Sequence, residues 1–213
     1  MTDLRYLLVP PTGLSRSEPA PLIVFLHGSG ERGDDLAKVK LWSPFPWLES
    51  GHKLPAFVVA PQCPLKDHWE DRFNELDGFL DSLLSQYPID ENRVLLTGFS
   101  MGGFGTWLWA QHRPERFAAI MPVGGNGFDV RDYRVGHDLG GLDETPVWMI
   151  HGAQDEVIPV AGADEMYQTL VAAGAPFGYT RYPHAGHTKT ATLAYADRAH
   201  YDWLLDQKRQ GSR

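Results

Sequence analysis

The sequence is poor in cysteine and in basic residues, and it lacks long apolar runs. Cys63 is the only cysteine in 213 residues, so a fold held together by intrachain disulfides is excluded. No segment approaches the ~18 consecutive apolar residues that a membrane-spanning helix needs. Lys and Arg number 19 against 27 Asp and Glu, and the net charge of −8 opposes binding to nucleic acid or anionic membranes. We therefore expect a cytoplasmic protein without nucleic-acid or membrane partners.

Short apolar segments alternate with helix-like patterns along most of the chain. Residues 4–9 predict an edge strand, and six further segments predict strands covered on both faces, at 22–26, 56–60, 94–97, 117–123, 147–150 and 177–182. Helices are predicted at 73–87, 103–112, 161–173 and 191–205, with loops at 42–55 and 126–145. This order is typical of a mostly parallel central sheet flanked by helices. The sequence thus predicts an α/β fold in one domain, residues 1–207, with a disordered tail at 208–213.

A glycine-rich motif around Ser100 follows the fourth predicted strand. The run Gly98-Phe99-Ser100-Met101-Gly102 matches Gly-x-Ser-x-Gly and is followed by the predicted helix at 103–112. Between a strand and a helix, this motif forms a sharp, strained turn that exposes the serine, and its glycines leave room for the neighbouring backbone. No Lys-Ser or Lys-Thr follows, so a phosphate-binding P-loop is excluded. The pattern predicts Ser100 as a nucleophile.

A serine nucleophile needs a base and an acid that orients the base, and the loops after two later strands supply candidates. Asp155 follows the sixth predicted strand, and we favour it over the adjacent Glu156 as the orienting acid. His187 follows the last predicted strand, and we favour it over His184 as the base. The two histidines could also bind a metal, but no third ligand stands at a recognisable spacing. We therefore expect Ser100, Asp155 and His187 to act together, without a metal.

The segment His27-Gly28-Ser29-Gly30 ends the second predicted strand, where this class of fold supplies hydrogen-bond donors. The negative oxygen that develops during acyl transfer needs two backbone N–H groups, and we expect Ser29 and Met101 to donate them. His27 is expected to hydrogen-bond the loop and not to take part in the chemistry. The charged residues that follow at 31–35 are expected to form ion pairs that hold the loop, with a substrate clamp as the alternative.

Seven tryptophans are many for a chain of this length, and three of them are expected at the same end of the sheet as Ser100. Trp42 and Trp47 lie in a proline-rich aromatic segment, and Trp69 follows the third predicted strand. Because ligands bind at the carboxyl ends of parallel strands, we expect all three to contact the substrate. A rigid aromatic wall favours short-chain or compact aromatic acyl groups. The alternative is that these side chains only pack in the core.

Together, these motifs resemble the small bacterial phospholipase/carboxylesterase-like α/β-hydrolases, which are relatives of the dienelactone hydrolases. The resemblance rests on LHGSGERGDD (26–35), APQCP (60–64), TGFSMGG (97–103) with GTW (105–107), HG (151–152) with Asp155, and GH (186–187). It implies an α/β-hydrolase fold, the triad Ser100, Asp155 and His187, an oxyanion hole from the backbone of Ser29 and Met101, and no cofactor. Cys63 lies at a family position, which implies a packed or pocket-wall residue and not a second nucleophile. The residues Thr188-Lys189-Thr190 depart from the family, which often has an acidic residue and a Trp there, so the leaving-group side stays unassigned.

The sequence therefore predicts a serine hydrolase that cleaves a small-molecule carboxylic ester through an acyl-enzyme. A peptidase or thioesterase is an alternative, because the same triad also cleaves amides and thioesters. A non-catalytic ligand-binding protein on the same scaffold is a second alternative, and the complete set of motifs argues against it. The sequence leaves the oligomeric state open.

Overall fold

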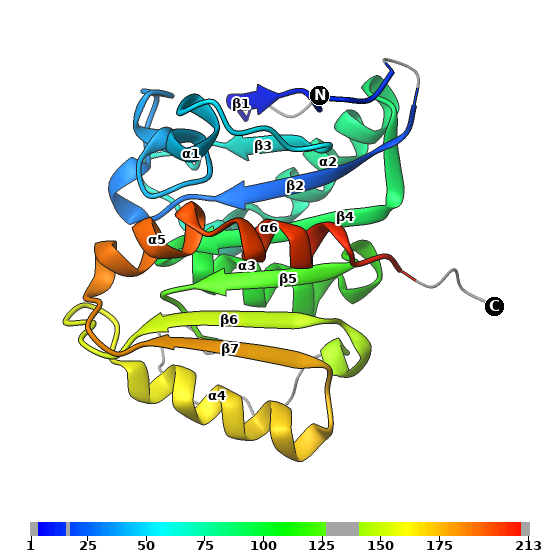
Figure 1. Ribbon diagram of the computed structural model, residues 1–213. Coiled ribbons are helices and arrows are strands. Elements are labelled where there is room, and N and C mark those ends of the chain that lie inside the picture. The colour runs from blue at the N-terminus through cyan, green and yellow to red at the C-terminus, as the bar shows by residue number, and fades with distance from the viewer. Residues whose placement is uncertain (1–3, 16–17, 127–140, 210–213) are drawn as a thin grey trace.

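One sheet forms the centre of the computed structural model, which describes residues 4–15, 18–126 and 141–209 (Figure 1). Its strands are β1 (Tyr6–Val9), β2 (Ala20–Leu26), β3 (Phe57–Pro61), β4 (Ile89–Phe99), β5 (Ala119–Val123), β6 (Val147–Gly152) and β7 (Phe177–Tyr182). They lie side by side in the order β1-β3-β2-β4-β5-β6-β7. Only the edge pair β1 and β3 is antiparallel. The mostly parallel sheet predicted from the sequence is therefore confirmed.

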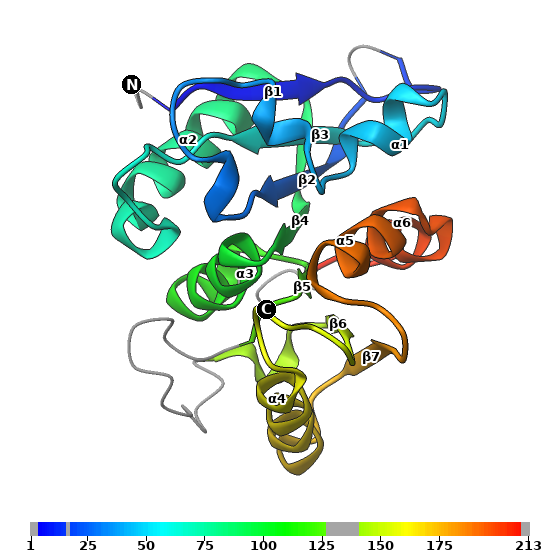
Figure 2. The same cartoon turned by 90° about the vertical axis from the view of Figure 1, so that its left-hand side faces the viewer.

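Helices cover both faces of this sheet (Figure 2). The α-helices are α1 (Phe45–Glu49), α2 (Phe73–Gln86), α3 (Met101–His112), α4 (Val160–Ala173), α5 (His187–Ala196) and α6 (Arg198–Leu205). Short 3-10 helices are η1 (Ser29–Glu31), η2 (Lys38–Lys40), η3 (Trp69–Arg72), η4 (Pro114–Arg116) and η5 (Leu142–Glu144). Helices α2, α3 and α4 lie on one face, and α1, α5 and α6 lie on the other. None of the helices in the described residues is long and apolar enough to span a bilayer.

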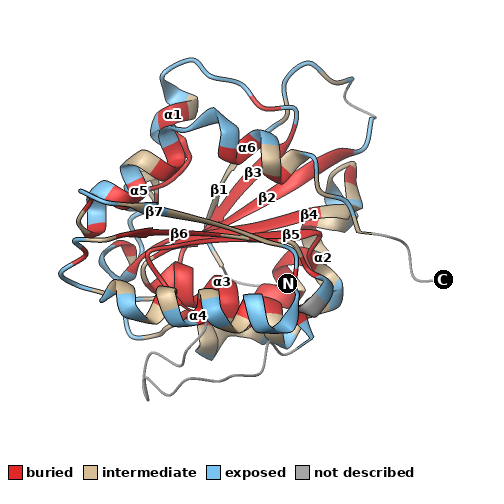
Figure 3. Cartoon of the chain, turned by 60° about the horizontal axis from the view of Figure 1, so that its bottom comes forward, coloured by how far each residue is buried: buried red, intermediate tan, exposed pale blue. Residues whose placement is uncertain are grey.

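The core has two layers, because each face of the sheet buries its own set of apolar side chains (Figure 3). All seven residues of β2 and all five residues of both β3 and β5 are buried. Strands that are covered on both sides can be apolar at every position, which explains why these segments lack alternation. The central strands therefore form a rigid platform, and the loops at their carboxyl ends extend from it.

Two predicted segments differ from the structure in more than the positions of their ends. Residues 42–55 contain the helix α1, in which prolines at the first turn are tolerated because their missing N–H has no partner there. The helix predicted at 191–205 is two helices, since Asp197 ends α5 and caps α6 by accepting a hydrogen bond from the N–H of Ala199. Of the tail predicted at 208–213, residues 210–213 lie outside the described residues, and the N–H of Arg209 donates to the Asn92 carbonyl oxygen at 2.9 Å.

The loop predicted at 126–145 falls mainly on residues 127–140, which lie outside the described residues. Its last part contains η5. The loop prediction for 127–140 therefore stays a prediction.

Candidate active site

Ser100 occupies the turn between β4 and α3, as the Gly-x-Ser-x-Gly motif predicts. Its backbone has φ 57° and ψ −117°, and among the described residues only Trp42 is another non-glycine residue with positive φ. The turn is held on both sides, because the N–H of Ser100 donates to the Val123 carbonyl at 2.9 Å and its carbonyl accepts from the N–H of Phe104 at 3.0 Å. Strain of this kind persists only where the surrounding structure fixes it, which is common at functional sites.

Two glycines allow the backbone of the turn to pack closely against its neighbours. A Cβ atom at Gly102 would lie 1.8 Å from the carbonyl oxygen of Leu26 in β2, and one at Gly98 would lie 2.2 Å from the carbonyl oxygen of Gly102. Both distances are far below van der Waals contact. Any other residue at these positions would therefore push α3 away from the sheet and displace Ser100.

The structure brings Ser100, His187 and Asp155 together in a continuous hydrogen-bonded chain. His187 Nε2 lies 2.8 Å from Ser100 Oγ, and His187 Nδ1 lies 2.7 Å from Asp155 Oδ2. His187 is the first residue of α5, and Asp155 lies in the loop after β6. A neutral imidazole with its proton on Nδ1 donates to the carboxylate and leaves Nε2 free to accept the serine proton.

Asp155 is held as an anion by several donors. Its Oδ1 accepts hydrogen bonds from the backbone N–H groups of Val157 at 2.9 Å and Ile158 at 2.8 Å. His151 Nε2 lies 3.5 Å from Oδ2, beside the closer His187. Burial opposes ionisation of Asp155, but the two imidazoles and the N–H of Ile158 outweigh it and hold its pKa well below the ordinary value. Sequence reasoning missed His151, which is fully buried against this carboxylate.

The two rejected candidates lie outside this chain of hydrogen bonds. Glu156 and His184 are both exposed, although each is close in sequence to the residue that was favoured. The Glu156 carboxylate points to the loop after β7. Its Oε2 lies 2.8 Å from the position that a Cβ atom at Gly186 would take. The geometry thus separates the members of each pair.

The loop after β2 lies directly beside Ser100. A Cβ atom at Gly28 would be 3.5 Å from Ser100 Cβ. Ser29 is the first residue of η1 and Met101 is the first residue of α3, so neither backbone N–H has a partner within its own helix. Two such free donors beside a nucleophile are what an oxyanion hole requires.

His27 holds this loop in place through two hydrogen bonds of its neutral imidazole. Its Nδ1 lies 2.7 Å from the Gly28 carbonyl oxygen, to which it donates, and its Nε2 accepts from the N–H of Cys63 at 2.9 Å. Burial lowers the pKa of His27 to about 4. Both ring nitrogens are satisfied in a single neutral tautomer, so His27 is a fixed support for the loop.

Trp69 corrects the sequence-based prediction that it contacts the substrate. Its side chain is fully buried, and its Nε1 donates to the His27 carbonyl oxygen at 2.9 Å. The indole also meets the His27 ring edge to face, with centroids 4.9 Å apart. Trp69 therefore packs behind the loop of Gly28 and Ser29 and has no accessible surface for a ligand.

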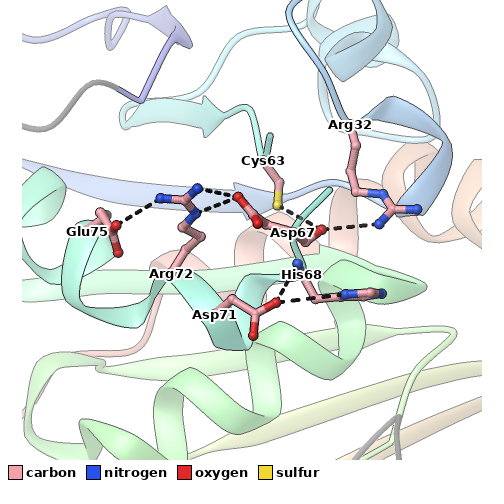
Figure 4. A network of polar contacts seen from close by, with 7 residues as sticks. All are labelled: Arg32, Cys63, Asp67, His68, Asp71, Arg72 and Glu75. Atoms are coloured by element: carbon pink, nitrogen blue, oxygen red, sulfur yellow. Dashed lines mark hydrogen bonds and ion pairs between the residues drawn. The ribbon is translucent and has the colours of Figure 1, made fainter. Parts of the chain in front are cut away.

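Figure 4 shows the polar network that fastens this loop to the segment after β3. Arg32 donates to the Ser29 carbonyl oxygen at 2.9 Å and to the Asp67 carbonyl oxygen at 3.2 Å. The Asp67 carboxylate forms an ion pair with Arg72, which also binds Glu75. The prediction that ion pairs hold the loop at 31–35 is thus wrong for Arg32, which holds the loop by donating to backbone carbonyl oxygens.

Cys63 belongs to the same network and is fully buried. Its thiol lies 3.5 Å from the Asp67 carbonyl oxygen, to which it donates. Burial raises the pKa of Cys63 to about 12, so the reactive thiolate is scarce at neutral pH. This agrees with the prediction that Cys63 is a packing residue.

Trp42 and Trp47 line an apolar cavity of about 430 Å³ between the segment around α1 and the helix α5. Trp47 is mostly buried and stacks on Tyr201, with ring centroids 4.6 Å apart, whereas Trp42 is 37% exposed at the rim. On the other side, the wall is formed by residues of α5, which begins at His187. Ser100 and His187 themselves do not line this cavity. The first residue of α5 in its wall, Ala191, lies about one helical turn after His187.

Comparisons with known proteins place these features in context. The family model for Phospholipase/Carboxylesterase matches residues 59–194. Feruloyl esterase C of Emericella nidulans is 29% identical over 170 residues, which are 78% of this chain and 60% of that protein. A protein of Salmonella typhimurium named "Putative carboxymethylenebutenolidase" is 36% identical over 157 residues, 63% of this chain and 57% of that protein.

A solved structure of a thermostable esterase has 31% sequence identity and a TM-score of 0.82, and the match covers 97% of this chain and 60% of that one. The chain thus spans about 60% of the length of these three proteins. The fold is an α/β-hydrolase fold. Because the family match covers more than half of the chain, the chain belongs to the phospholipase/carboxylesterase family.

Proposed function

We propose that this chain is a carboxylesterase-type serine hydrolase in which Ser100 is the nucleophile, His187 the base and Asp155 the orienting acid. One observation carries the proposal: the hydrogen-bonded chain from Ser100 Oγ through both nitrogens of His187 to Asp155, with distances of 2.8 Å and 2.7 Å. A serine hydroxyl is a weak nucleophile, and this arrangement is the one that activates it.

In the proposed reaction, Ser100 Oγ attacks the ester carbonyl carbon while His187 Nε2 takes the serine proton. The carbonyl oxygen becomes negative and accepts hydrogen bonds from the backbone N–H groups of Ser29 and Met101. The imidazolium then gives its proton to the leaving alcohol as the bond from carbon to the ester oxygen breaks. A water molecule, deprotonated by His187, then attacks the carbonyl carbon of the acyl-enzyme. The bond from this carbon to Ser100 Oγ breaks, the imidazolium gives its proton to Oγ, and the acid is released.

For the substrate, we propose a small-molecule ester with a short-chain or compact aromatic acyl group. The apolar cavity beside α5 supports this, because stacked and proline-flanked aromatic side chains make its wall rigid. The name of the relative from Emericella nidulans, a feruloyl esterase, also describes an aromatic acyl group. A peptidase or thioesterase is the alternative, since the same three residues suit either reaction.

The proposal is tested by labelling with a fluorophosphonate and by turnover of p-nitrophenyl acetate. We expect wild type to be labelled and active, and Ser100→Ala to lose labelling and to lose about 10⁶-fold in kcat. Ser85→Ala, which changes an exposed serine of α2, is the matched control. A Ser100→Ala protein within about tenfold of wild type would remove Ser100 from the mechanism. A panel of p-nitrophenyl esters, thioesters and aminoacyl anilides then separates the esterase from its alternatives.

A further inference from the structure

Glu31 places a buried carboxylate next to the nucleophile. It lies in η1, and only 6% of the residue is exposed. The position that a Cβ atom at Gly28 would take lies 2.9 Å from Glu31 Oε2 and 3.5 Å from Ser100 Cβ. The carboxylate and Ser100 therefore face each other across the bare backbone of Gly28.

This carboxylate has no ion-pair partner among the described residues. Burial raises the pKa of Glu31, while the N–H groups of Gly28 and Glu31 and the charges of His187 and Lys38 oppose that rise. The nearest arginine in sequence, Arg32, is directed to the carbonyl oxygens of Ser29 and Asp67 (Figure 4). Backbone N–H groups therefore hold the carboxylate, and its negative charge stays beside Ser100 without a cation from the described part of the chain at ion-pair distance.

We propose that Glu31 makes the site select esters whose acyl group is uncharged and reject those whose acyl group carries a carboxylate. The inference rests on the proposed function, because it assumes that the substrate binds over Ser100. Two like charges about 12 Å apart at an effective dielectric constant of about 20 repel enough to lower binding or reaction about tenfold. Glu31 itself is buried, so salt screens its charge less than that of a surface carboxylate.

The test compares two p-nitrophenyl esters of the same shape, the 4-carbamoylbenzoate and the 4-carboxybenzoate, at pH 7.5. Only the second carries a negative charge, and neither can cyclise. The kcat/KM of the neutral ester is divided by that of the charged ester. This ratio is then divided by the same ratio of hydroxide-catalysed rates, which removes the difference in intrinsic reactivity between the two esters. For wild type we expect this corrected ratio to favour the neutral ester by about tenfold or more.

The variant Glu31→Gln keeps the shape and an oxygen acceptor for the N–H of Gly28 but removes the charge. We expect its corrected ratio to fall about tenfold toward one, and because this is a ratio of two esters it does not depend on the overall activity of the variant. Glu115→Gln makes the same chemical change in η4, at the other end of the sheet, and should leave the ratio unchanged. Because an unpaired buried charge is removed, we also expect Glu31→Gln to have a melting temperature at or above that of wild type.

A corrected wild-type ratio near one would overturn the inference without any variant, as would a Glu31→Gln ratio equal to that of wild type. If Glu31→Gln does not fold, the wild-type ratio alone decides. Turnover that survives in Ser100→Ala would refute the proposed function and this inference with it. Turnover that depends on Ser100 but shows no preference between the two esters refutes the inference alone.

Discussion

Asp155 and His187 are 32 residues apart in sequence, yet Asp155 Oδ2 and His187 Nδ1 lie 2.7 Å apart. The two residues follow neighbouring parallel strands, β6 and β7, whose loops are joined by backbone hydrogen bonds. The N–H of Ala153 donates to the Tyr182 carbonyl oxygen at 2.8 Å, and the N–H of Gln154 donates to the Ala185 carbonyl oxygen at 3.1 Å. The two side chains are thus positioned before any substrate arrives, which is the preorganisation that the proposed mechanism needs.

The two histidines of the loop after β7 should differ sharply in their effect on turnover. We expect His187→Ala to lose about 10⁶-fold in kcat, as the loss of a triad base does elsewhere. His184→Ala changes an exposed side chain outside the hydrogen-bonded chain and should stay within about twofold of wild type. Initial rates with p-nitrophenyl acetate measure both. An active His187→Ala protein together with an inactive His184→Ala protein would reverse the assignment.

The aromatic cavity should set the preferred acyl chain length. We expect wild type to favour acetyl to butyryl esters over palmitoyl esters and Trp47→Ala to shift the optimum to longer chains, because the lost indole leaves room beside α5. Each extra methylene that becomes buried is worth about 0.8 kcal/mol, or roughly fourfold in kcat/KM. The measurement is kcat/KM for p-nitrophenyl esters of increasing length.

A control separates a cavity effect from a general loss of packing. Trp203→Ala removes a partly buried indole of α6 that does not line the cavity, and it should leave the chain-length profile of wild type in place. An unchanged profile in Trp47→Ala, or a wild-type optimum at long chains, would mean that Trp47 only packs against Tyr201.

The sequence was informative where local backbone signals define a role. Gly98 and Gly102 mark the turn at Ser100, and the ends of apolar strands mark where loop residues such as Asp155 must lie. Whether a side chain is buried depends on distant parts of the chain, which local patterns do not show. For this reason Trp69 was predicted to contact the substrate although it is buried. Its indole finds a carbonyl group of the loop after β2, 42 residues away. Periodicity alone could not show that Asp197 divides the last helix, although aspartate is a common helix cap.

The close approach of the elbow to β2 predicts a strong difference between two glycines. Gly102→Ala should fail to fold or lose most of its stability, because the new Cβ would lie 1.8 Å from the Leu26 carbonyl oxygen. Gly30→Ala should fold normally, since nothing lies within 4 Å of its Cβ position. Soluble yield and thermal melting by circular dichroism measure both. A Gly102→Ala protein with the melting temperature of wild type would show that α3 can move away from β2.

The last prediction concerns His27 and the pH dependence of stability. Burial lowers its pKa to about 4 in the folded protein, whereas an unfolded histidine titrates near the ordinary value of ~6.5. As the pH falls below ~6.5, the unfolded chain takes up a proton that the folded protein does not, so the free energy of unfolding decreases until the pH reaches about 4. The expected loss is about 2 kcal/mol at pH 5 and about 3 kcal/mol at pH 4.

Urea unfolding of wild type and His27→Gln at pH 7.5 and pH 5 tests this. Asp155, whose pKa is lowered in the fold, stabilises the protein above its unfolded pKa and loses that contribution only as the pH falls below ~4, outside this interval. At pH 7.5 wild type should be the more stable protein, because glutamine reproduces the two hydrogen bonds of His27 poorly. At pH 5 the difference should shrink by about 2 kcal/mol, because the glutamine does not titrate. A constant difference, or a His27 ring signal in NMR that titrates near ~6.5, would contradict the buried neutral imidazole.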